Sequence, residues 1–214
     1  MEDSGGCCRC CTSFIFTMGL TALFMWLSLR TSKPTCSIQS FLVPALNQTL
    51  NTTTNTTIYF DLKLDNGNKD KGIYYDNINL TVTYRTNISL PLNTSQPIKN
   101  LTVNGFYQGH NKKAKRNQSF VPDRFDWPAA KRTVSTNGST VFRVDLATKV
   151  RFKIIFWKTK RQKLIVGADV EVDKQGVKIK KKGIKLSGGS QLGCHSLQVG
   201  ALLNLLAFVF LLSW

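Results

Sequence analysis

The sequence predicts a mainly β protein, a single antiparallel β-sandwich tethered by an N-terminal transmembrane helix. Apolar and polar residues alternate along much of the chain after Arg30, a pattern typical of half-buried strands. Segments rich in Asn and Gly separate these runs, and no stretch between Arg30 and Lys185 has a convincing 3.6-residue periodicity. Before them, the twenty residues from Cys10 to Leu29 carry no charge.

The uncharged run predicts the transmembrane helix. At ~1.5 Å of rise per residue, residues 10–29 form a helix about 30 Å long, the thickness of the hydrocarbon core of a bilayer. Trp26 lies near one end of the run, where an indole prefers the interface, and Arg30 and Lys33 close that end. The alternative is a cleaved secretory signal, but the residues from Leu27 to Pro34 contain no Ala-x-Ala pattern. We therefore predict an uncleaved anchor, preceded by a short Cys-rich tail of residues 1–9.

Four cysteines lie at the start of the anchor: Cys7, Cys8, Cys10 and Cys11. A metal site is one interpretation, but adjacent cysteines cannot all point at one ion, and no His lies nearby to complete a tetrahedral shell. Juxtamembrane cysteines in a reducing compartment are typical S-acylation sites. We predict acylation of these four residues, with unmodified thiols as the alternative.

Asparagine indicates which side of the membrane the main domain occupies. Nine Asn-x-Ser/Thr sequons follow the anchor, well above chance: Asn47, Asn51, Asn55, Asn79, Asn87, Asn93, Asn100, Asn117 and Asn137. Since N-linked glycans are added in the secretory lumen, the sequons predict an extracellular domain and a cytosolic tail. We expect a glycosylated membrane-proximal linker at residues 30–57, mobile from Asn47 to Thr57, and the β-sandwich at residues 58–186.

Alternating apolar residues define the expected strands. The runs are Ile58, Phe60, Leu62 and Leu64; Ile78, Leu80, Val82 and Tyr84; Phe142, Val144 and Leu146; Val150, Phe152, Ile154 and Phe156; and Leu164, Val166, Ala168, Val170 and Val172. Turns are expected from Asp65 to Gly72 and at Asn137-Gly138, which are rich in the residues that turns require. Several short strands with frequent turns predict an antiparallel sandwich.

The C-terminal segment, residues 187–214, predicts a glycosylphosphatidylinositol signal that is removed. Small residues are followed by a polar spacer to Gln198 and an apolar run from Val199 to Trp214, which is the arrangement of such signals. The attachment candidates are Ser187, Gly188 and Gly189. The alternative is a second membrane helix, but the run is short and would place Asn204 near the bilayer centre.

Cys36 lies just outside the predicted membrane. If the C-terminal tail with Cys194 is removed, Cys36 is the unpaired extracellular cysteine, which suggests an intermolecular disulfide, such as one linking a homodimer, or a free thiol. If the tail is retained, Cys36 and Cys194 are candidates to pair.

The formal charge of +17 is concentrated in three clusters. The first is Lys112, Lys113, Lys115 and Arg116; the second is Lys158, Lys160, Arg161 and Lys163; the third is Lys178, Lys180, Lys181, Lys182 and Lys185. The last two clusters follow the final sequon, so glycans leave them bare, and they are the candidates for binding a polyanion. Nucleic acid fits the charge but not the compartment, whereas acidic wall polysaccharide or a membrane surface fits both. The alternative is a solvated basic face that serves solubility.

No catalytic, metal or cofactor site is visible in the sequence. His110 lies in a loop-like context, His195 lies in the tail, and no nucleophile or phosphate-binding glycine loop has a telling spacing. Asp169 and Glu171 share a strand face, but we interpret them as solvated strand residues rather than a carboxylate pair of a glycosidase. The sequence therefore predicts a non-enzymatic protein.

Four segments carry a resemblance to a known family: Cys11–Arg30, Asn68–Asp76, Phe106–His110 and Val150–Arg161. Together they resemble the non-race-specific disease resistance proteins within the harpin-induced-like family, and the likeness spans almost the whole chain. This resemblance implies an extracellular late-embryogenesis-abundant group 2 domain, a fibronectin-III-like β-sandwich. The turn here reads Asn66-Gly67-Asn68 where that domain usually has Asn-Pro-Asn, and no Arg-Gly-Asp or Asn-Gly-Asp tripeptide occurs.

The same resemblance implies a role. It implies a plasma-membrane protein of plant defence and the hypersensitive response, required for resistance signalling downstream of coiled-coil nucleotide-binding leucine-rich-repeat receptors. It also implies contact between the cytosolic tail and a membrane-tethered immune regulator, and adhesion of the plasma membrane to the cell wall. The alternative is structural coupling of wall and membrane during osmotic or water stress, with only an indirect effect on immunity.

Overall fold

The structure is a computed structural model that describes residues 5–48, 55–86 and 96–188. The chain forms two compact units, one containing the N-terminal helix α1 (Gly5–Leu29) and the other, here called the β unit, spanning Thr31–Gly189. Three predicted glycosylation sites, Asn51, Asn87 and Asn93, lie outside the described residues, as do Gly189 and the remainder of the predicted lipid-attachment signal.

Helix α1 is 25 residues long and includes the whole uncharged run. Thr17 and Thr21 donate hydrogen bonds to backbone carbonyls three or four residues before them, so their hydroxyls are satisfied within the helix. Within the described part of the chain, no helix combines the length and apolar character that a membrane crossing requires. The predicted anchor at residues 10–29 therefore stays a prediction.

The β unit contains two antiparallel sheets. In the first sheet the strand order is β11 (Ile184–Lys185), β1 (Thr35–Leu42), β2 (Ile58–Asp65) and β7 (Lys113–Phe120). The second sheet has the order β5 (Gln96–Val103), β4 (Ile78–Arg85), β8 (Ser139–Ile154), β3 (Gly72–Tyr75) and β6 (Phe106–Gln108), and β9 (Trp157–Lys158) and β10 (Gln162–Asp173) also pair with β8. This confirms the predicted mainly β, antiparallel class.

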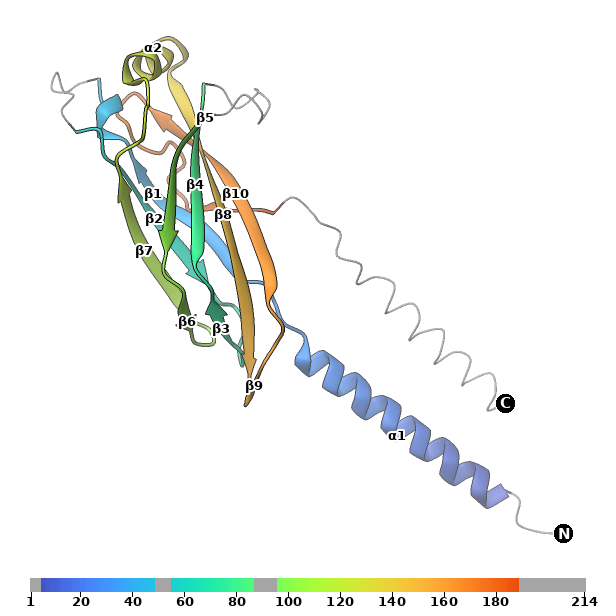
Figure 1. Ribbon diagram of the computed structural model, residues 1–214. Coiled ribbons are helices and arrows are strands. Elements are labelled where there is room, and N and C mark those ends of the chain that lie inside the picture. Colours follow the sequence, from blue (N-terminus) through green and yellow to red (C-terminus); the bar gives the residue numbers. More distant parts are fainter. Residues whose placement is uncertain (1–4, 49–54, 87–95, 189–214) are drawn as a thin grey trace. The chain divides into compact units, whose positions relative to one another are not determined.

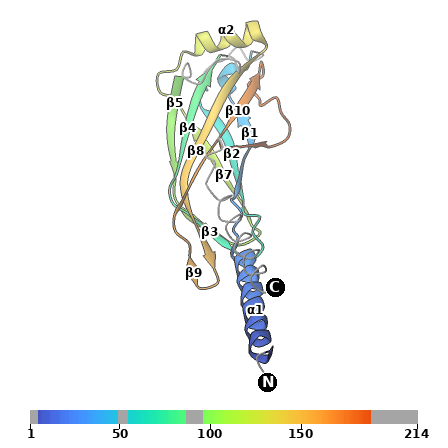
Figure 2. The same ribbon diagram turned by 90° about the vertical axis from the view of Figure 1, so that its right-hand side faces the viewer.

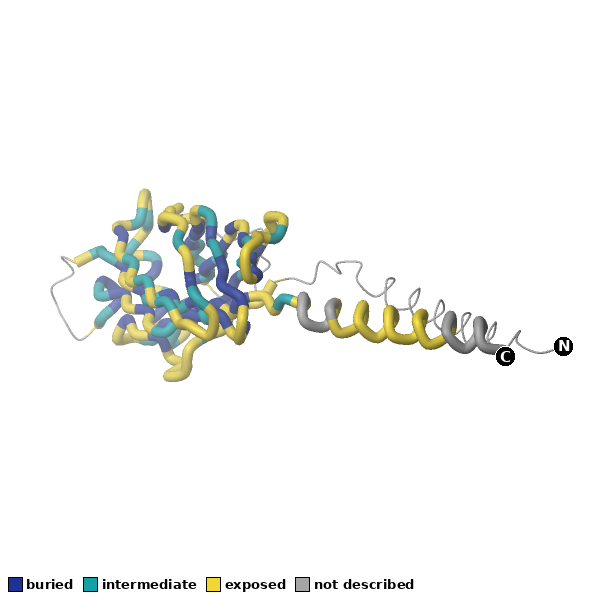
Figure 3. Tube along the Cα trace, turned by 90° about the horizontal axis from the view of Figure 1, so that it is seen from below, coloured by how far each residue is buried: buried dark blue, intermediate teal, exposed yellow. Residues whose placement is uncertain are grey.

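The two sheets enclose one apolar core. Phe41 of β1 contacts Phe142 of β8, with ring centroids 5.4 Å apart, and Phe41 also stacks on Phe60 of β2. The expected alternation is visible along β2, where Ile58, Phe60, Leu62 and Leu64 are all buried. Figure 3 shows the buried positions inside the β unit and the exposed ones on its outside.

Three details differ from the expectation. First, β1 and a short 3-10 helix, η1 (Pro44–Leu46), lie inside the stretch predicted as linker. Strand β1 belongs to the first sheet because Cys36, Ile38 and Phe41 are buried in the core. Second, two of the expected runs form one continuous strand of 16 residues, β8. Third, Phe156, expected to point inward, is 98% exposed because a turn begins at Ile155.

The helix α2 (Trp127–Asn137) was not predicted. Asp126 caps its N-terminus, because the Asp126 side chain accepts a hydrogen bond from the Ala129 N–H, and only Ala130 and Val134 are buried along the helix. Gly138 ends the helix in a left-handed conformation (φ 79°). The turn expected at Asn137-Gly138 is therefore the C-terminal cap of a helix.

The β unit has two distinct ends, seen in Figures 1 and 2, with α2 at one and β3, β6 and β9 at the other. We call the second the hairpin end; it contains the turns at residues 66–71, 109–112 and 155–156. Backbone hydrogen bonds join the first two turns, from Asn66 N–H to the Lys112 carbonyl and from Asn111 N–H to the Asn68 carbonyl. The third turn comes two residues after Lys153 of β8, which pairs with Gly72 of β3.

An asparagine clasp, formed by Asn66 and Asn68, holds the hairpin end together. Asn66 is 0% exposed and donates to the carbonyls of Lys71 (2.8 Å) and Gly109 (3.0 Å). Its Oδ1 accepts from the backbone and side-chain N–H groups of Asn68. Asn68 in turn exchanges two hydrogen bonds of 2.8 Å with the backbone of Ser32. The start of the β unit is thereby fixed to the hairpin end.

Candidate functional site

The basic candidates from the sequence lie in two places on the β unit. The second cluster lies at the hairpin end, on β9, on the start of β10 and between them. The third follows β10 and includes β11, which pairs with β1 at the margin of the first sheet. We call the exposed residues of the third cluster the flank surface: Lys180, Lys181, Lys182 and Lys185.

Lys178 does not belong to that surface, which corrects the prediction. Its side chain is buried and donates from Nζ to the carbonyls of Ile38, Gln39 and Lys182. Burial lowers the pKa of Lys178. This residue fastens the segment that carries the flank surface to β1, which is a structural role that the sequence pattern did not distinguish from the exposed lysines beside it.

At the hairpin end, Lys158 and Arg161 have defined contacts. Lys158 lies over the ring of Tyr74, 4.4 Å from its centroid, and Tyr74 packs on Tyr107 at 4.5 Å. Arg161 donates to Asp76 at 3.0 Å, and Arg151 pairs with the same carboxylate at 3.5 Å. Lys160 is exposed. Arg161 is thus partly neutralised, whereas the side chain of Lys158 is held beside the turn at residues 155–156.

Lys163 lines an open hollow of about 790 Å³ on the second sheet. The hollow is also lined by Lys149, Ile165 and the sequon residue Asn79. A glycan attached to Asn79 would occupy this space, so the hollow is a poor candidate for a ligand site.

The β8–β9 turn was not predicted from the sequence. Ile154 pairs with Trp157, so Ile155 and Phe156 form a two-residue turn, and both are exposed, at 71% and 98%. Ile155 has φ 51°, a left-handed conformation that costs a residue with a Cβ roughly 1–2 kcal/mol. Such turns normally use Asn-Gly or Gly at these positions. The alternation rule placed Phe156 inside because it carries no information on where a strand reverses.

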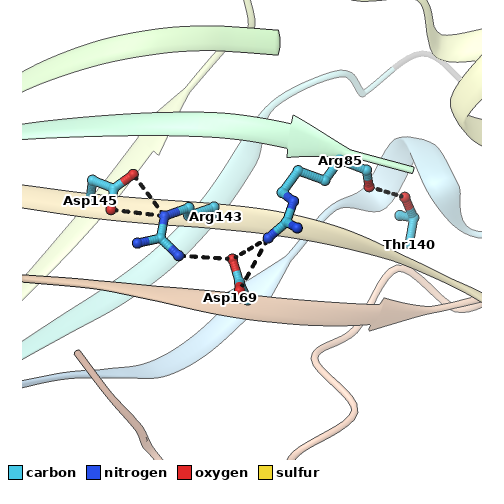
Figure 4. Close-up of polar contacts among 5 residues, drawn as sticks. All are labelled: Arg85, Thr140, Arg143, Asp145 and Asp169. Carbon is cyan, nitrogen blue, oxygen red and sulfur yellow. Dashed lines mark hydrogen bonds and ion pairs between the residues drawn. The ribbon is translucent and has the colours of Figure 1, made fainter. Parts of the chain in front are cut away.

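A network of charges on the second sheet accounts for Asp169 (Figure 4). Arg85 of β4, whose side chain is 5% exposed, donates to both carboxylate oxygens of Asp169 at 3.3 Å. Arg143 of β8 bridges Asp169 at 3.3 Å and Asp145 at 3.0 Å. A Cβ on Gly167 would collide with the Asp145 carboxylate, so glycine makes room for the network. Asp169 is therefore an ion-paired residue rather than a freely solvated one.

Cys36 is buried in β1, and burial raises the pKa of its thiol to about 12. Disulfide exchange requires a thiolate that a partner can reach. Of the two interpretations of the sequence, the fold favours the free thiol and argues against an intermolecular disulfide through Cys36. Cys194, the other candidate partner, lies outside the described residues.

The modification candidates are distributed over the whole chain. Asn55, Asn79, Asn100, Asn117 and Asn137 are exposed, and Asn47 is half-buried. Cys7, Cys8, Cys10 and Cys11 lie in helix α1. Ser187 and Gly188 are exposed, and Ser187 exchanges two backbone hydrogen bonds of 3.0 Å with Gly167.

Comparison with known proteins gives the family. The chain is 50% identical over 212 residues to Protein NDR1 of Arabidopsis thaliana, and the match covers 97% of this chain and 96% of that protein. The chain belongs to the NDR1 family of non-race-specific disease resistance proteins. This confirms the resemblance noted from the four sequence segments and makes the chain a plant disease-resistance protein.

Two other comparisons add nothing to the NDR1 assignment. No family model matches the chain. A solved structure, described as the crystal structure of a protein from Archaeoglobus fulgidus, is 12% identical, with a TM-score of 0.34 and coverage of 67% of this chain and 97% of that one. A TM-score this low establishes neither a common fold nor a common function.

Proposed function

We propose that this NDR1-family protein is a non-enzymatic plasma-membrane glycoprotein that acts in disease-resistance signalling and in adhesion of the membrane to the cell wall. Residues 10–29 would cross the membrane, residues 1–9 would lie in the cytosol, and the β unit, a late-embryogenesis-abundant group 2 domain, would be extracellular. The observation that carries the topology is the set of five exposed sequons on the β unit. The uncharged run within one helix supports the anchor.

The topology predicts a specific result with intact protoplasts. Added protease is expected to digest the β unit, and enzymatic removal of N-glycans from the untreated protein is expected to increase its gel mobility. Replacing Asn79 and Asn100 with Gln should remove part of that shift. A β unit that resists protease until the protoplasts are lysed, or a mobility unchanged by deglycosylation, would refute the extracellular assignment.

For adhesion, the proposed contact is between the flank surface and acidic wall polysaccharide. The segment from Lys174 to Gly188 contains six lysines and no Asp or Glu, and no sequon follows Asn137. The Nζ hydrogen bonds of Lys178 to β1 fasten this segment and leave the lysines around it in solvent. Point charges of this kind attract a polyanion more than they specify one.

Changing Lys180, Lys181 and Lys182 together to Gln is expected to weaken binding to polygalacturonate about tenfold, because each exposed charge contributes about 0.5 kcal/mol. Binding of the unchanged protein should fall as salt is raised. The matched control changes Lys112, Lys113 and Lys115 to Gln. These residues are exposed at the start of β7 and in the turn before it, so the net charge of the protein falls by the same amount. Co-sedimentation measures both variants. Equal losses would show that total charge, not the flank surface, governs binding.

Signalling would depend on the other side of the membrane. We propose that residues 1–9 contact a membrane-tethered immune regulator and that acylation of Cys7, Cys8, Cys10 and Cys11 strengthens membrane attachment. Lipid attachment near Ser187 would hold the other end of the β unit's chain. The alternative, structural coupling of wall and membrane, predicts that exchanging residues 2–11 leaves resistance intact. The signalling role predicts that this exchange abolishes resistance and spares wall attachment.

A further inference from the structure

The β8–β9 turn presents the most exposed large apolar side chain in the described part of the β unit. Phe156 is 98% exposed, Ile155 is 71% exposed and the neighbouring Trp157 is also exposed. These three consecutive large apolar residues are therefore not buried against the rest of the β unit. Monomeric soluble proteins rarely expose contiguous apolar groups of this kind to water. The left-handed backbone at Ile155 places a β-branched residue where Gly or Asn would relax the turn.

We call Ile155, Phe156 and Trp157 the β8–β9 tip. Cationic side chains flank this tip on both strands. Lys153 and Lys158 are paired neighbours across the hairpin, and Lys160 follows. The contact of Lys158 with Tyr74, and of Tyr74 with Tyr107, holds the cation beside the apolar group. An apolar tip next to cations, with a tryptophan between them, matches the layering of a bilayer surface, where acyl chains lie beneath phosphates.

The position of the tip in the chain also favours a contact with the bilayer surface. The asparagine clasp fixes Ser32 to the hairpin end, to which the tip also belongs. If residues 10–29 cross the membrane, as proposed above, only about three residues, or roughly 10 Å of extended chain, separate the end of that helix from Ser32. This short length of chain limits how far Ser32 can lie from the membrane surface. No sequon asparagine lies in residues 101–116 or 138–188, so the turns at 109–112 and 155–156 carry no glycan that would keep them away.

We propose that the β8–β9 tip inserts Ile155, Phe156 and Trp157 into the interface of the bilayer that anchors the chain, with Lys153, Lys158 and Lys160 on the phospholipid phosphates. The inference rests on the proposed membrane anchor. A second copy of the chain is the other apolar surface that the tip could meet, but the surrounding cations would repel one another in a contact between two identical tips. The β unit would thus contact the membrane through this tip in addition to its covalent attachment to the anchor.

The test uses the full chain with Trp26 and Trp214 changed to Phe, reconstituted into vesicles of phosphatidylcholine and phosphatidylglycerol, some with lipids brominated near the headgroup. Two tryptophans remain, Trp157 at the tip and Trp127 on α2 at the opposite end of β8. Most of that strand of 16 residues, which is about 50 Å long, separates them. We expect brominated lipid to quench Trp157 several-fold more than Trp127, with Trp157→Phe identifying each contribution.

Phe156→Asp should abolish the quenching of Trp157 without changing the amount of protein that floats with the vesicles. The matched control is Val121→Asp, at an exposed valine just after β7 and away from the hairpin end, which should leave quenching unchanged. Protein that floats while Trp157 is not quenched overturns the tip contact and leaves the anchor standing. Protein that fails to float overturns the anchor and, with it, this inference. A blue-shifted Trp157 emission without lipid quenching would identify a second copy as the occupant and also overturn it.

Discussion

Asn66→Asp is expected to remove a large part of the stability of the β unit. The substitution preserves shape but replaces an NH₂ group that donates to two carbonyls, those of Lys71 and Gly109, with an oxygen that repels them. Each buried group left unsatisfied costs about 1–3 kcal/mol, and a carboxylate at a 0% exposed position adds a desolvation penalty. We expect a loss of about 4 kcal/mol or more, against a total of about 5–15 kcal/mol for a typical domain.

Urea denaturation followed by circular dichroism measures this loss in the detergent-solubilised full chain. Asn77→Asp is the matched control, because Asn77 is exposed and accepts from the Gly105 N–H through Oδ1, an atom that aspartate retains. The control should change the free energy of unfolding by less than about 0.5 kcal/mol. If both variants unfolded at the same urea concentration, the asparagine clasp would not be what holds the hairpin end together.

The sequence predicted the strands best where burial alone decides their structure. Along β2, and along β10 from Ala168 to Asp173, every second residue is buried, so alternation in the sequence corresponds to alternation in the fold. Elements with few buried residues escaped this rule. Helix α2 buries only Ala130 and Val134, which is too short a pattern to show helical periodicity, although Asp126 and Gly138 do carry the cap signals that delimit it.

The functional candidates were predicted less well because they depend on contacts between distant segments. Lys178 and Lys180 are equivalent in the sequence, yet one reaches carbonyls of β1, 140 residues earlier in the chain, and the other faces solvent. Asp169 acquires its partners from β4 and β8. Phe156 continues an alternating run but falls where the strand turns back. Charge composition gave the approximate locations, whereas register and topology decided which side chains are available.

Asp169→Asn is expected to destabilise the β unit by about 2–4 kcal/mol. It removes the carboxylate opposite the Arg85 guanidinium, and the side chain of Arg85 is 5% exposed, so water cannot replace the lost interaction. Breaking a fully buried pair costs about 3–5 kcal/mol, and the expected value is smaller because Asp169 is itself 23% exposed. The midpoint of urea unfolding, at an unchanged m-value, measures the difference.

Two further variants separate the buried charge from the rest of the network. Asp145→Asn removes a carboxylate of the same network that is 39% exposed, and Arg143 keeps its contact with Asp169, so we expect a loss below about 1 kcal/mol. The double change Arg85→Leu with Asp169→Leu removes both charges and is expected to recover part of the stability lost in Asp169→Asn. If Asp169→Asn were no more destabilising than Asp145→Asn, burial of Arg85 would not be the cause. A double variant less stable than Asp169→Asn would show instead that the ion pair stabilises the fold beyond compensating its own charges.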